Sequence, residues 1–269
     1  MKLAYLGSPD VAVAPLRAIV EAGHEVIVVV TQPDRRRGRG AQLVPTPVKG
    51  AAVELGIDVI HDSGALTELA DEVELGVVVA FGQMIKASVL AAVPMVNLHF
   101  SLLPRWRGAA PVERALLAGD SQTGVCVMGV VEELDAGPVY RSQTVPIDST
   151  VTANQLRLQL CTVGIDLLLD ALEHGLGEPT AQTGEITYAA KITPEDLRID
   201  WGREPIEIHR QIRVGNAWTT FEGRRIKILS ADLVDDSLRI GRVQPEGRGP
   251  MDYGAWKRGV RAADDTWFE

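Results

Sequence analysis

The chain has few of the features that mark secreted, metal-binding or membrane proteins. Among its 269 residues only Cys126 and Cys161 are cysteines, and both lie in apolar stretches without CxxC spacing. Two such cysteines form neither a disulfide framework nor a zinc site. The N-terminus turns polar after Gly7, and no run approaches the roughly 20 apolar residues of a membrane span. We therefore expect a cytoplasmic protein with no signal peptide, no membrane contact and no bound metal.

The chain also lacks an excess of positive charge. It carries 27 basic and 36 acidic side chains, for a formal net charge of -9. Residues 1–190 hold 13 basic and 22 acidic groups, and residues 191–269 hold 14 of each. This balance argues against a protein that binds nucleic acid through general positive charge. Any contact with RNA must be local.

Two common enzyme motifs are absent. Gly7-Ser-Pro-Asp follows the first apolar run, where a dinucleotide-binding protein would carry G-x-G-x-x-G, so a nicotinamide dehydrogenase is disfavoured. Ser101 has no G-x-S-x-G elbow, and Cys126 lies inside an apolar run. The sequence therefore offers no obvious covalent nucleophile.

Short apolar runs rich in β-branched residues alternate with helical segments in the first part of the chain. The predicted strands are Lys2–Gly7, Glu25–Thr31, Asp58–Ile60, Leu75–Ala80 and Met95–His99. Asp10 is expected to cap a helix that runs through Ala22 and ends at Gly23. The alternation predicts an α/β fold with a Rossmann-like, mostly parallel, doubly wound sheet. Such sheets bind ligands beyond the carboxyl ends of their strands.

The rest of the chain predicts two more strands, a long helix and then a small β-rich domain. Gly124–Val131 and Pro138–Val145 indicate two further strands, and Thr152 with Gln155 forms a capping box before a long helix. The apolar face of this helix is predicted to consist of Leu156, Leu160, Val163 and Leu167. After Gly184 a helix at 204–212 and strands at 225–229 and 238–243 indicate a small β-rich domain. We expect a sheet domain at 1–190, a linker at 191–205 and the β-rich domain at 206–269.

Three polar residues stand out as candidates for catalysis. Asn97 and His99 are two positions apart at the end of a predicted strand, so their side chains project to the same side. Asp135 stands in the turn Leu-Asp-Ala-Gly-Pro. Each also has a simpler reading, because Asn and Asp stabilise turns and a histidine can be satisfied at a strand edge. Together they suggest acyl transfer: Asn97 and protonated His99 would donate to an oxyanion, while Asp135 holds the imidazole and accepts a proton.

Longer stretches around these residues resemble the methionyl-tRNA formyltransferases. The resemblance lies in Asn97-Leu-His-Phe-Ser-Leu-Leu-Pro-Arg-Trp-Arg-Gly, in Leu134-Asp-Ala-Gly and in Thr31-Gln-Pro-Asp-Arg-Arg-Arg-Gly-Arg-Gly, and extends from residue 3 to about 230. The Asn, His and Asp are similar to those of all folate-dependent formyltransferases. The Thr-Gln-Pro-Asp stretch is more particular to the tRNA enzymes.

The resemblance implies a co-substrate, 10-formyltetrahydrofolate, and a macromolecular partner, an aminoacylated initiator tRNA. It places the folate against Phe81, Gly82, Gln83, Met84 and Ile85 and against Leu134, Ala136 and Gly137. It places the tRNA against two groups of residues, an arginine loop and the segment after His99. These are Arg35, Arg36, Arg37 and Arg39, and Ser101, Leu102, Leu103 and Pro104. Guanidinium groups suit phosphates and exposed bases, and we expect the enzyme to act as a monomer.

Three other functions share part of this pattern, and the first of them is the serious alternative. An enzyme that formylates a nucleotide-linked amino sugar shares the three polar residues but usually lacks the arginine loop. A formyltetrahydrofolate hydrolase shares them too, but is expected to carry a regulatory domain ahead of the sheet. A non-catalytic module that binds folate or tRNA would not need all three polar residues. An assay of turnover distinguishes such a module from an enzyme.

Two departures from the family pattern bear on the acceptor. Phe100 stands where the family usually has Gly, which would narrow the acceptor channel or place a ring in the interior. Between Asp235 and Leu238 the chain has almost nothing, whereas family members have several strands there. We therefore predict a trimmed, OB-like C-terminal barrel that binds tRNA more weakly than a full-length barrel would.

Overall fold

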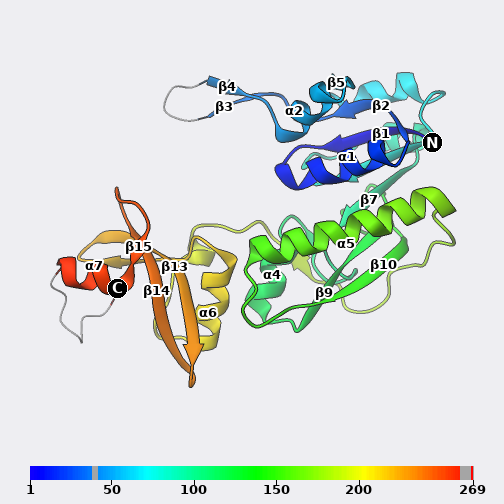
Figure 1. Ribbon diagram of the computed structural model, residues 1–269. Helices are drawn as coiled ribbons and strands as arrows, with labels where there is room; N and C mark the ends of the chain where they lie inside the picture. Colours follow the sequence, from blue (N-terminus) through cyan, green and yellow to red (C-terminus); the bar gives the residue numbers. More distant parts are fainter. Residues whose placement is uncertain (38–41, 261–267, 269) are drawn as a thin grey trace. The chain divides into compact units, whose positions relative to one another are not determined.

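The computed structural model describes residues 1–37, 42–260 and 268. The chain forms two compact units, which Figure 1 shows in colours that follow the sequence. Unit 1 comprises Met1–Pro111, Gln122–Pro146 and Arg157–Ala189, and unit 2 comprises Val112–Ser121, Ile147–Leu156 and Ala190–Glu269. Within these residues no helix is both long and apolar enough to cross a membrane.

The centre of unit 1 is a seven-stranded sheet. Its strands, in order across the sheet, are β10 (Val139–Pro146), β9 (Gln122–Gly129), β7 (Met95–His99), β6 (Leu75–Val79), β1 (Lys2–Gly7), β2 (Glu25–Val30) and β5 (Asp58–Ile60). The five strands from β7 to β5 are parallel, and β9 is antiparallel to both of its neighbours. The predicted mostly parallel, Rossmann-like sheet is confirmed.

The inner strands are buried because the sheet is covered on both faces. β6 is buried along its whole length, and β1 is exposed only at Lys2. Such strands read as continuous apolar runs rather than as alternating patterns. The seven strands predicted for the sheet domain lie within two residues of their observed bounds.

Seven helical segments lie within the described residues before Gly175. They are η1 (Asp10–Ala12), α1 (Val13–Glu21), α2 (Pro47–Glu54), η2 (Ser63–Leu69), α3 (Ala87–Ala92), α4 (Pro111–Ala118) and α5 (Ala153–His174). Asp10 does not cap a helix as predicted: it is the first residue of a 3-10 turn whose N-cap is Pro9. The predicted capping box is confirmed, since the Thr152 N–H donates to Gln155 Oε1 at 2.9 Å and the Gln155 N–H donates to Thr152 Oγ1 at 3.4 Å.

The buried face of α5 is rotated from the predicted one. Leu156 and Leu160 are buried, but Val163 and Leu167 are only half-buried. Gly164 is buried instead, and a Cβ at this position would lie 3.0 Å from Leu98 Cδ2. The helix therefore lies against the sheet at a glycine, which a count of apolar side chains does not detect.

The arginine-rich segment contains a β-hairpin. β3 (Arg35–Arg37) pairs antiparallel with β4 (Gln42–Val44). Arg35 and Arg36 are exposed. The sequence shows no periodicity in this segment, yet the segment contains two paired strands. Arg39 lies outside the described residues.

A second small pairing joins distant parts of unit 1. β8 (Arg107–Gly108) runs parallel to β11 (Tyr188–Ala189). The Arg107 N–H donates to the Thr187 carbonyl and the Ala109 N–H to the Ala189 carbonyl, each at 2.9 Å. The segment after His99 is therefore fixed by residues about 80 positions later in the chain.

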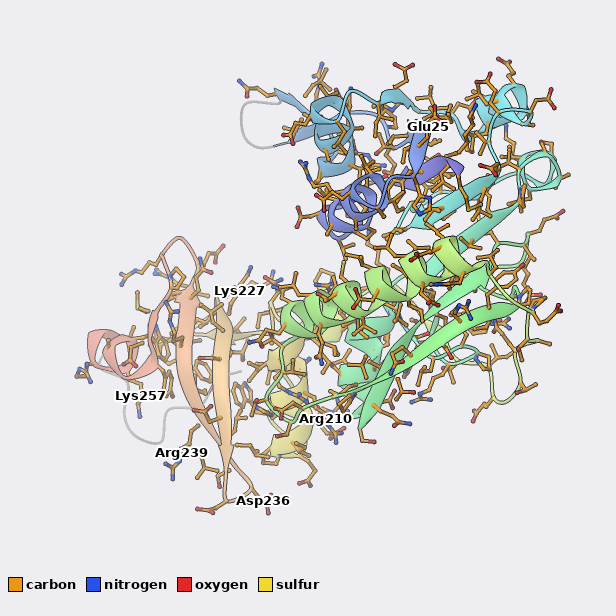
Figure 2. The ribbon with its side chains drawn as sticks, turned by 45° about the vertical axis from the view of Figure 1, so that its right-hand side comes forward. Glu25, Arg210, Lys227, Asp236, Arg239 and Lys257 are labelled. Carbon is orange, nitrogen blue, oxygen red and sulfur yellow. The ribbon has the colours of Figure 1, made fainter. Side chains whose placement is uncertain are left out.

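Unit 2 is built on an antiparallel sheet of four strands. They are β12 (Trp218–Phe221), β13 (Arg224–Val234), β14 (Ser237–Pro245) and β15 (Met251–Asp252), and η3 (Glu195–Leu197), α6 (Pro205–Val214) and α7 (Tyr253–Val260) accompany them. The order β12-β13-β14-β15 is open: within the described residues no pairing of β12 with β15 closes it. Figure 2 shows Asp236 at the tip of the β13–β14 hairpin.

The core of unit 2 begins earlier in the chain than predicted. Ile199, in the segment expected to be a linker, is buried with Ile208, Ile228 and Trp256. Its N–H donates to the Trp218 carbonyl at 2.8 Å. Residues 191–205 are therefore part of the packed unit.

Candidate active site

A pocket of about 550 Å³ opens in unit 1 where the central strands end. Its lining includes Pro9 after β1, residues 80–85 after β6 and residues 97–100 at the end of β7. The chain reverses direction across the sheet between β1 and β6, because β2 and β5 lie on one side of β1 and β6 lies on the other. Open α/β sheets bind ligands at such a reversal. The volume is within the range of small-molecule sites.

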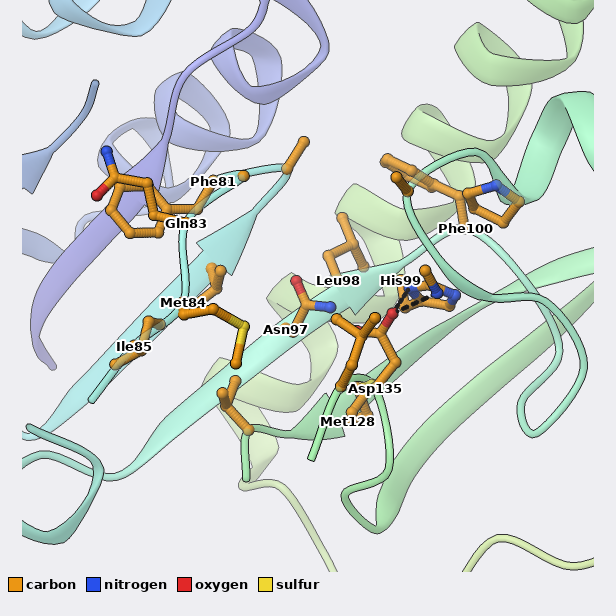
Figure 3. Close-up of a pocket in the computed structure, with 18 of the residues that line it drawn as sticks. Phe81, Gln83, Met84, Ile85, Asn97, Leu98, His99, Phe100, Met128 and Asp135 are labelled. Atoms are coloured by element: carbon orange, nitrogen blue, oxygen red, sulfur yellow. Dashed lines mark hydrogen bonds and ion pairs between the residues drawn. The ribbon is translucent and has the colours of Figure 1, made fainter. Parts of the chain in front are cut away.

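Asn97, His99 and Asp135 line the same part of this pocket. Figure 3 shows the three side chains directed toward one another, with Asn97 and His99 coming from β7. The two-residue spacing on an extended strand places both on one side, as predicted. His99 is only 5% exposed, and Asn97 is half-buried.

Asp135 is held in an unusual backbone conformation. Its φ of 49° lies in the left-handed region, which Asp adopts more readily than most residues. Its Oδ2 accepts a hydrogen bond from the Gly108 N–H at 2.7 Å and lies 3.7 Å from His99 Nδ1. The carboxylate is therefore fixed beside the imidazole by a backbone donor.

The hydrogen bonds of His99 assign its tautomer. Nε2 lies 3.0 Å from the Trp106 carbonyl oxygen. A carbonyl can only accept, so Nε2 carries the proton and the lone pair of the neutral ring is on Nδ1. The nitrogen that faces Asp135 is thus the one that gains a proton.

Burial lowers the pKa of His99 below its ordinary value, and the nearby Asp135 charge and the Trp106 carbonyl oppose this effect only in part. The lowered pKa favours the neutral form of the ring in the free protein. A histidine in this state can accept a proton through Nδ1.

The predicted folate residues fall into two groups. Those that line the pocket are Phe81, Gly82, Gln83, Met84, Ile85 and Leu134. Ala136 and Gly137, both within the described part of the chain, do not line it. The carbonyl of Gly137 accepts a hydrogen bond from the Gln182 amide instead, at 2.7 Å.

Among the predicted tRNA residues, the four that follow Phe100 lie outside the pocket lining. Ser101 is fully buried, and its hydroxyl donates to the Arg105 carbonyl at 2.6 Å, so it presents no surface to a macromolecule. Pro104 is also buried, and Leu102 and Leu103 are half-buried. Phe100 is 8% exposed and forms part of the pocket wall, which fits both a ring in the interior and a narrower channel.

Four residues near the pocket were not singled out from the sequence. They are Gln32, Trp106, Arg107 and Gln182. The Gln32 amide donates to the Phe81 carbonyl at 3.1 Å and so supports the turn after β6. Arg107 and Gln182 contact the Asp135 turn from behind. Trp106 and Arg107 belong to a quoted motif, but Gln182 is 47 residues from Asp135 and carries no local signal.

Comparison with known proteins identifies the family. Residues 1–172 match the formyl transferase family, and residues 191–238 match the formyl transferase C-terminal domain. The chain belongs to the formyl transferase family. It is 42% identical over 300 residues to the methionyl-tRNA formyltransferase of Phenylobacterium zucineum, an alignment that covers 97% of each protein. Because 300 exceeds the 269 residues of this chain, that relative has residues that this chain lacks.

Solved structures share the fold at low sequence identity. An N-formyltransferase from Helicobacter canadensis, described with folinic acid and dTDP-3-aminofucose, superposes with a TM-score of 0.66 at 19% identity and covers 87% of this chain and 88% of that one. The methionyl-tRNA formyltransferase from Clostridium thermocellum gives 0.64 at 15% identity and covers 93% and 100%. The fold is therefore common to enzymes with different acceptors.

Proposed function

We propose that this protein transfers the formyl group of 10-formyltetrahydrofolate to the α-amine of methionyl-tRNA. The observation that carries the chemistry is the meeting of Asn97, His99 and Asp135 in one pocket beyond the sheet. The choice of acceptor rests on the 42% identity with the Phenylobacterium zucineum enzyme across nearly the whole of both chains. We further propose that the enzyme acts in the cytoplasm, as a monomer.

The pocket offers apolar contact to the faces of a flat heterocycle. Its wall includes Phe81, Ile85 and Met128, which are apolar, and its rim includes Met84 and Leu134. Met84 is 72% exposed and Leu134 is 51% exposed, so both present apolar surface beside the cavity. A pterin ring lying across these residues would cover them. Formyl folate therefore fits the residues present.

The proposed reaction begins with the neutral amine and the neutral His99 ring. The amine nitrogen attacks the formyl carbon, and the Asn97 side-chain amide donates a hydrogen bond to the oxygen that becomes negative. Nδ1 of His99 accepts the proton that the attacking nitrogen loses. Asp135, 3.7 Å away, stabilises the imidazolium that results.

The second half of the reaction returns the histidine to its starting state. The bond between the formyl carbon and the folate nitrogen breaks, and the imidazolium returns its proton to that nitrogen. The products are tetrahydrofolate and formyl-methionyl-tRNA. Burial of His99 favours its neutral form at the start, and the charged Asp135 beside it favours the cationic form during the reaction. Burial and the Asp135 charge thus act on the pKa of the ring in opposite directions.

An assay with two acceptors tests the proposal. Purified enzyme and 10-formyltetrahydrofolate are offered either methionyl initiator tRNA or a nucleotide-linked 3-amino sugar, and the formylated products are quantified. We expect formyl-methionyl-tRNA to form at a far higher kcat/KM. Efficient formylation of the sugar without transfer to the charged tRNA would contradict the proposed acceptor, and no transfer to either would contradict the proposed reaction.

A further inference from the structure

Gln182 and Arg107 lie together behind the turn that carries Asp135. Arg107 is 5% exposed although it is charged, and its Nε and Nη2 both donate to Gln182 Oε1, at 3.0 Å and 2.8 Å. Its Nη1 donates to Glu133 at 3.0 Å. The buried guanidinium is thus paired on one side with a carboxylate and on the other with the side-chain oxygen of Gln182.

The other end of the Gln182 amide reaches the backbone of the turn. Nε2 donates to the Asp135 carbonyl at 2.8 Å and to the Gly137 carbonyl at 2.7 Å. An arginine can only donate and a carbonyl can only accept, so the amide has one orientation that satisfies both neighbours. Both of its hydrogens are then used to bind alternate carbonyls of one short turn.

The turn needs such support. Asp135 has a φ of 49°, in the left-handed region, where the Cβ of any L residue crowds the backbone. On its far side the turn is in close contact with β9, because a Cβ on Gly137 would lie 1.8 Å from the Gly129 carbonyl oxygen. The backbone is therefore held between β9 and the Gln182 amide.

We infer that Gln182 is a positioning residue, which acts through the Asp135 backbone to keep the carboxylate beside His99 Nδ1. The inference rests on the proposed function, since it gives Asp135 and His99 their roles. Arg107 acts one step further away by fixing the orientation of the Gln182 amide. Displacement of a reacting group by about 1 Å can lower a rate a hundredfold, so the loss of two short hydrogen bonds to the turn is enough to matter.

Two substitutions separate the contacts of Gln182. Gln182→Glu keeps an oxygen for Arg107 but removes both donors to the turn, and Gln182→Met removes contacts on both sides without adding charge. We expect each to lower kcat by roughly ten- to hundredfold. Gln143→Met is the matched control, because Gln143 is exposed on β10 and its amide also donates to a carbonyl, that of Thr144. It should leave kcat unchanged.

A second readout does not depend on turnover. The His99 pKa is measured by NMR titration of the free enzyme, with His99→Gln used to assign the signal. The Asp135 charge raises this pKa, so withdrawal of the carboxylate in Gln182→Met should lower it relative to the wild type. A change confined to overall stability would shift the melting temperature but not this titration.

The outcomes distinguish this inference from the proposed function. If Gln182→Glu keeps the wild-type kcat, Gln182 serves Arg107 alone and the inference is overturned. An unchanged His99 pKa in Gln182→Met overturns it as well. If the wild-type enzyme transfers no formyl group, the proposed function fails, and the titration still decides whether Gln182 positions Asp135.

Discussion

The two sheets of the molecule place their polar side chains differently. In unit 1 the central strands are buried on both faces, and the polar groups that matter gather beyond their carboxyl ends around one pocket. In unit 2 buried and exposed residues follow one another along β13, and Arg225 lies on the exposed side of that strand. A covered sheet concentrates chemistry at one place, whereas a half-exposed sheet spreads charge over a surface. We therefore expect turnover to depend on unit 1 and tRNA affinity to depend largely on unit 2.

The largest effect should come from the pocket residues of unit 1. Asn97→Ala, His99→Ala and Asp135→Ala are each expected to lower kcat by about a hundredfold or more, as loss of an oxyanion donor typically does. Circular dichroism melting should show that the variants remain folded. His174→Ala is the control, because His174 also pairs with an aspartate, Asp170, but is exposed on α5. A His99→Ala enzyme with near wild-type turnover would contradict the mechanism.

A smaller effect, confined to tRNA binding, is expected on unit 2. Arg225 lies 4.1 Å and Arg198 5.6 Å from the Trp218 ring centroid, so two cations flank one aromatic side chain. Replacing both by Gln should raise the KM for tRNA and lower the slope of binding against salt by about one unit per lost phosphate contact. The KM for folate should not change. Arg203→Gln, at an exposed arginine paired with Glu207, is the control.

The arginine hairpin belongs to unit 1 but is expected to affect tRNA binding rather than turnover. It therefore tests whether the division of roles between the two units is complete. Arg35→Ala with Arg36→Ala should raise the KM for tRNA and lower its salt slope while kcat stays close to that of the wild type. Arg17→Ala, on α1 and paired with Glu54, serves as the control. A salt slope equal to that of the wild type would mean that these two arginines are only solvated.

The smallest expected effect is on stability at acid pH, and both units should show it. Burial is the main cause that lowers the pKa of His99 in unit 1 and of His209 in unit 2. At a pH between the lowered pKa of the folded state and the ordinary pKa near 6.5, the unfolded chain binds more protons than the folded chain. The free energy of unfolding therefore falls as the pH falls through this window. Urea unfolding at pH 7 and at pH 5.5 measures the change. His99→Gln and His209→Gln should each reduce this dependence.

Much of the sheet and part of the site could be predicted from the sequence, for one physical reason. Buried parallel strands are local apolar runs, and the two-residue spacing of Asn97 and His99 at the end of such a run already determines that they share a side. That Asp135 lies beside His99 depends instead on β9 returning next to β7, which the resemblance supplied and local pattern did not. The support from Gln182 depends on the β8–β11 pairing and leaves no mark in either segment.

Other differences arose where side-chain type concealed the backbone. The strand β3 was not predicted, because it consists of arginines and so lacks the alternation of apolar and polar residues that indicates a strand. The contact face of α5 was predicted from large apolar side chains, but the helix packs closely against the sheet at Gly164, which has no side chain. The segment at 191–205 was expected to be a linker, yet Leu197 and Ile199 in it are buried; the alternation of Leu197, Ile199 and Trp201 with polar residues spans only five residues.

The tight turn between β13 and β14 limits which deletions and insertions this part of the chain can accept. Asp235 and Asp236 have φ values of 49° and 57° and form a two-residue connection between the paired Val234 and Ser237. The match to the family's C-terminal domain ends close by, at residue 238. A two-residue connection has no residue to spare, so any further deletion here would remove paired residues from both strands. Insertion is the open route: a longer segment grafted at this tip would need only modest loop-closure entropy, which makes the turn a natural place to lengthen the sheet.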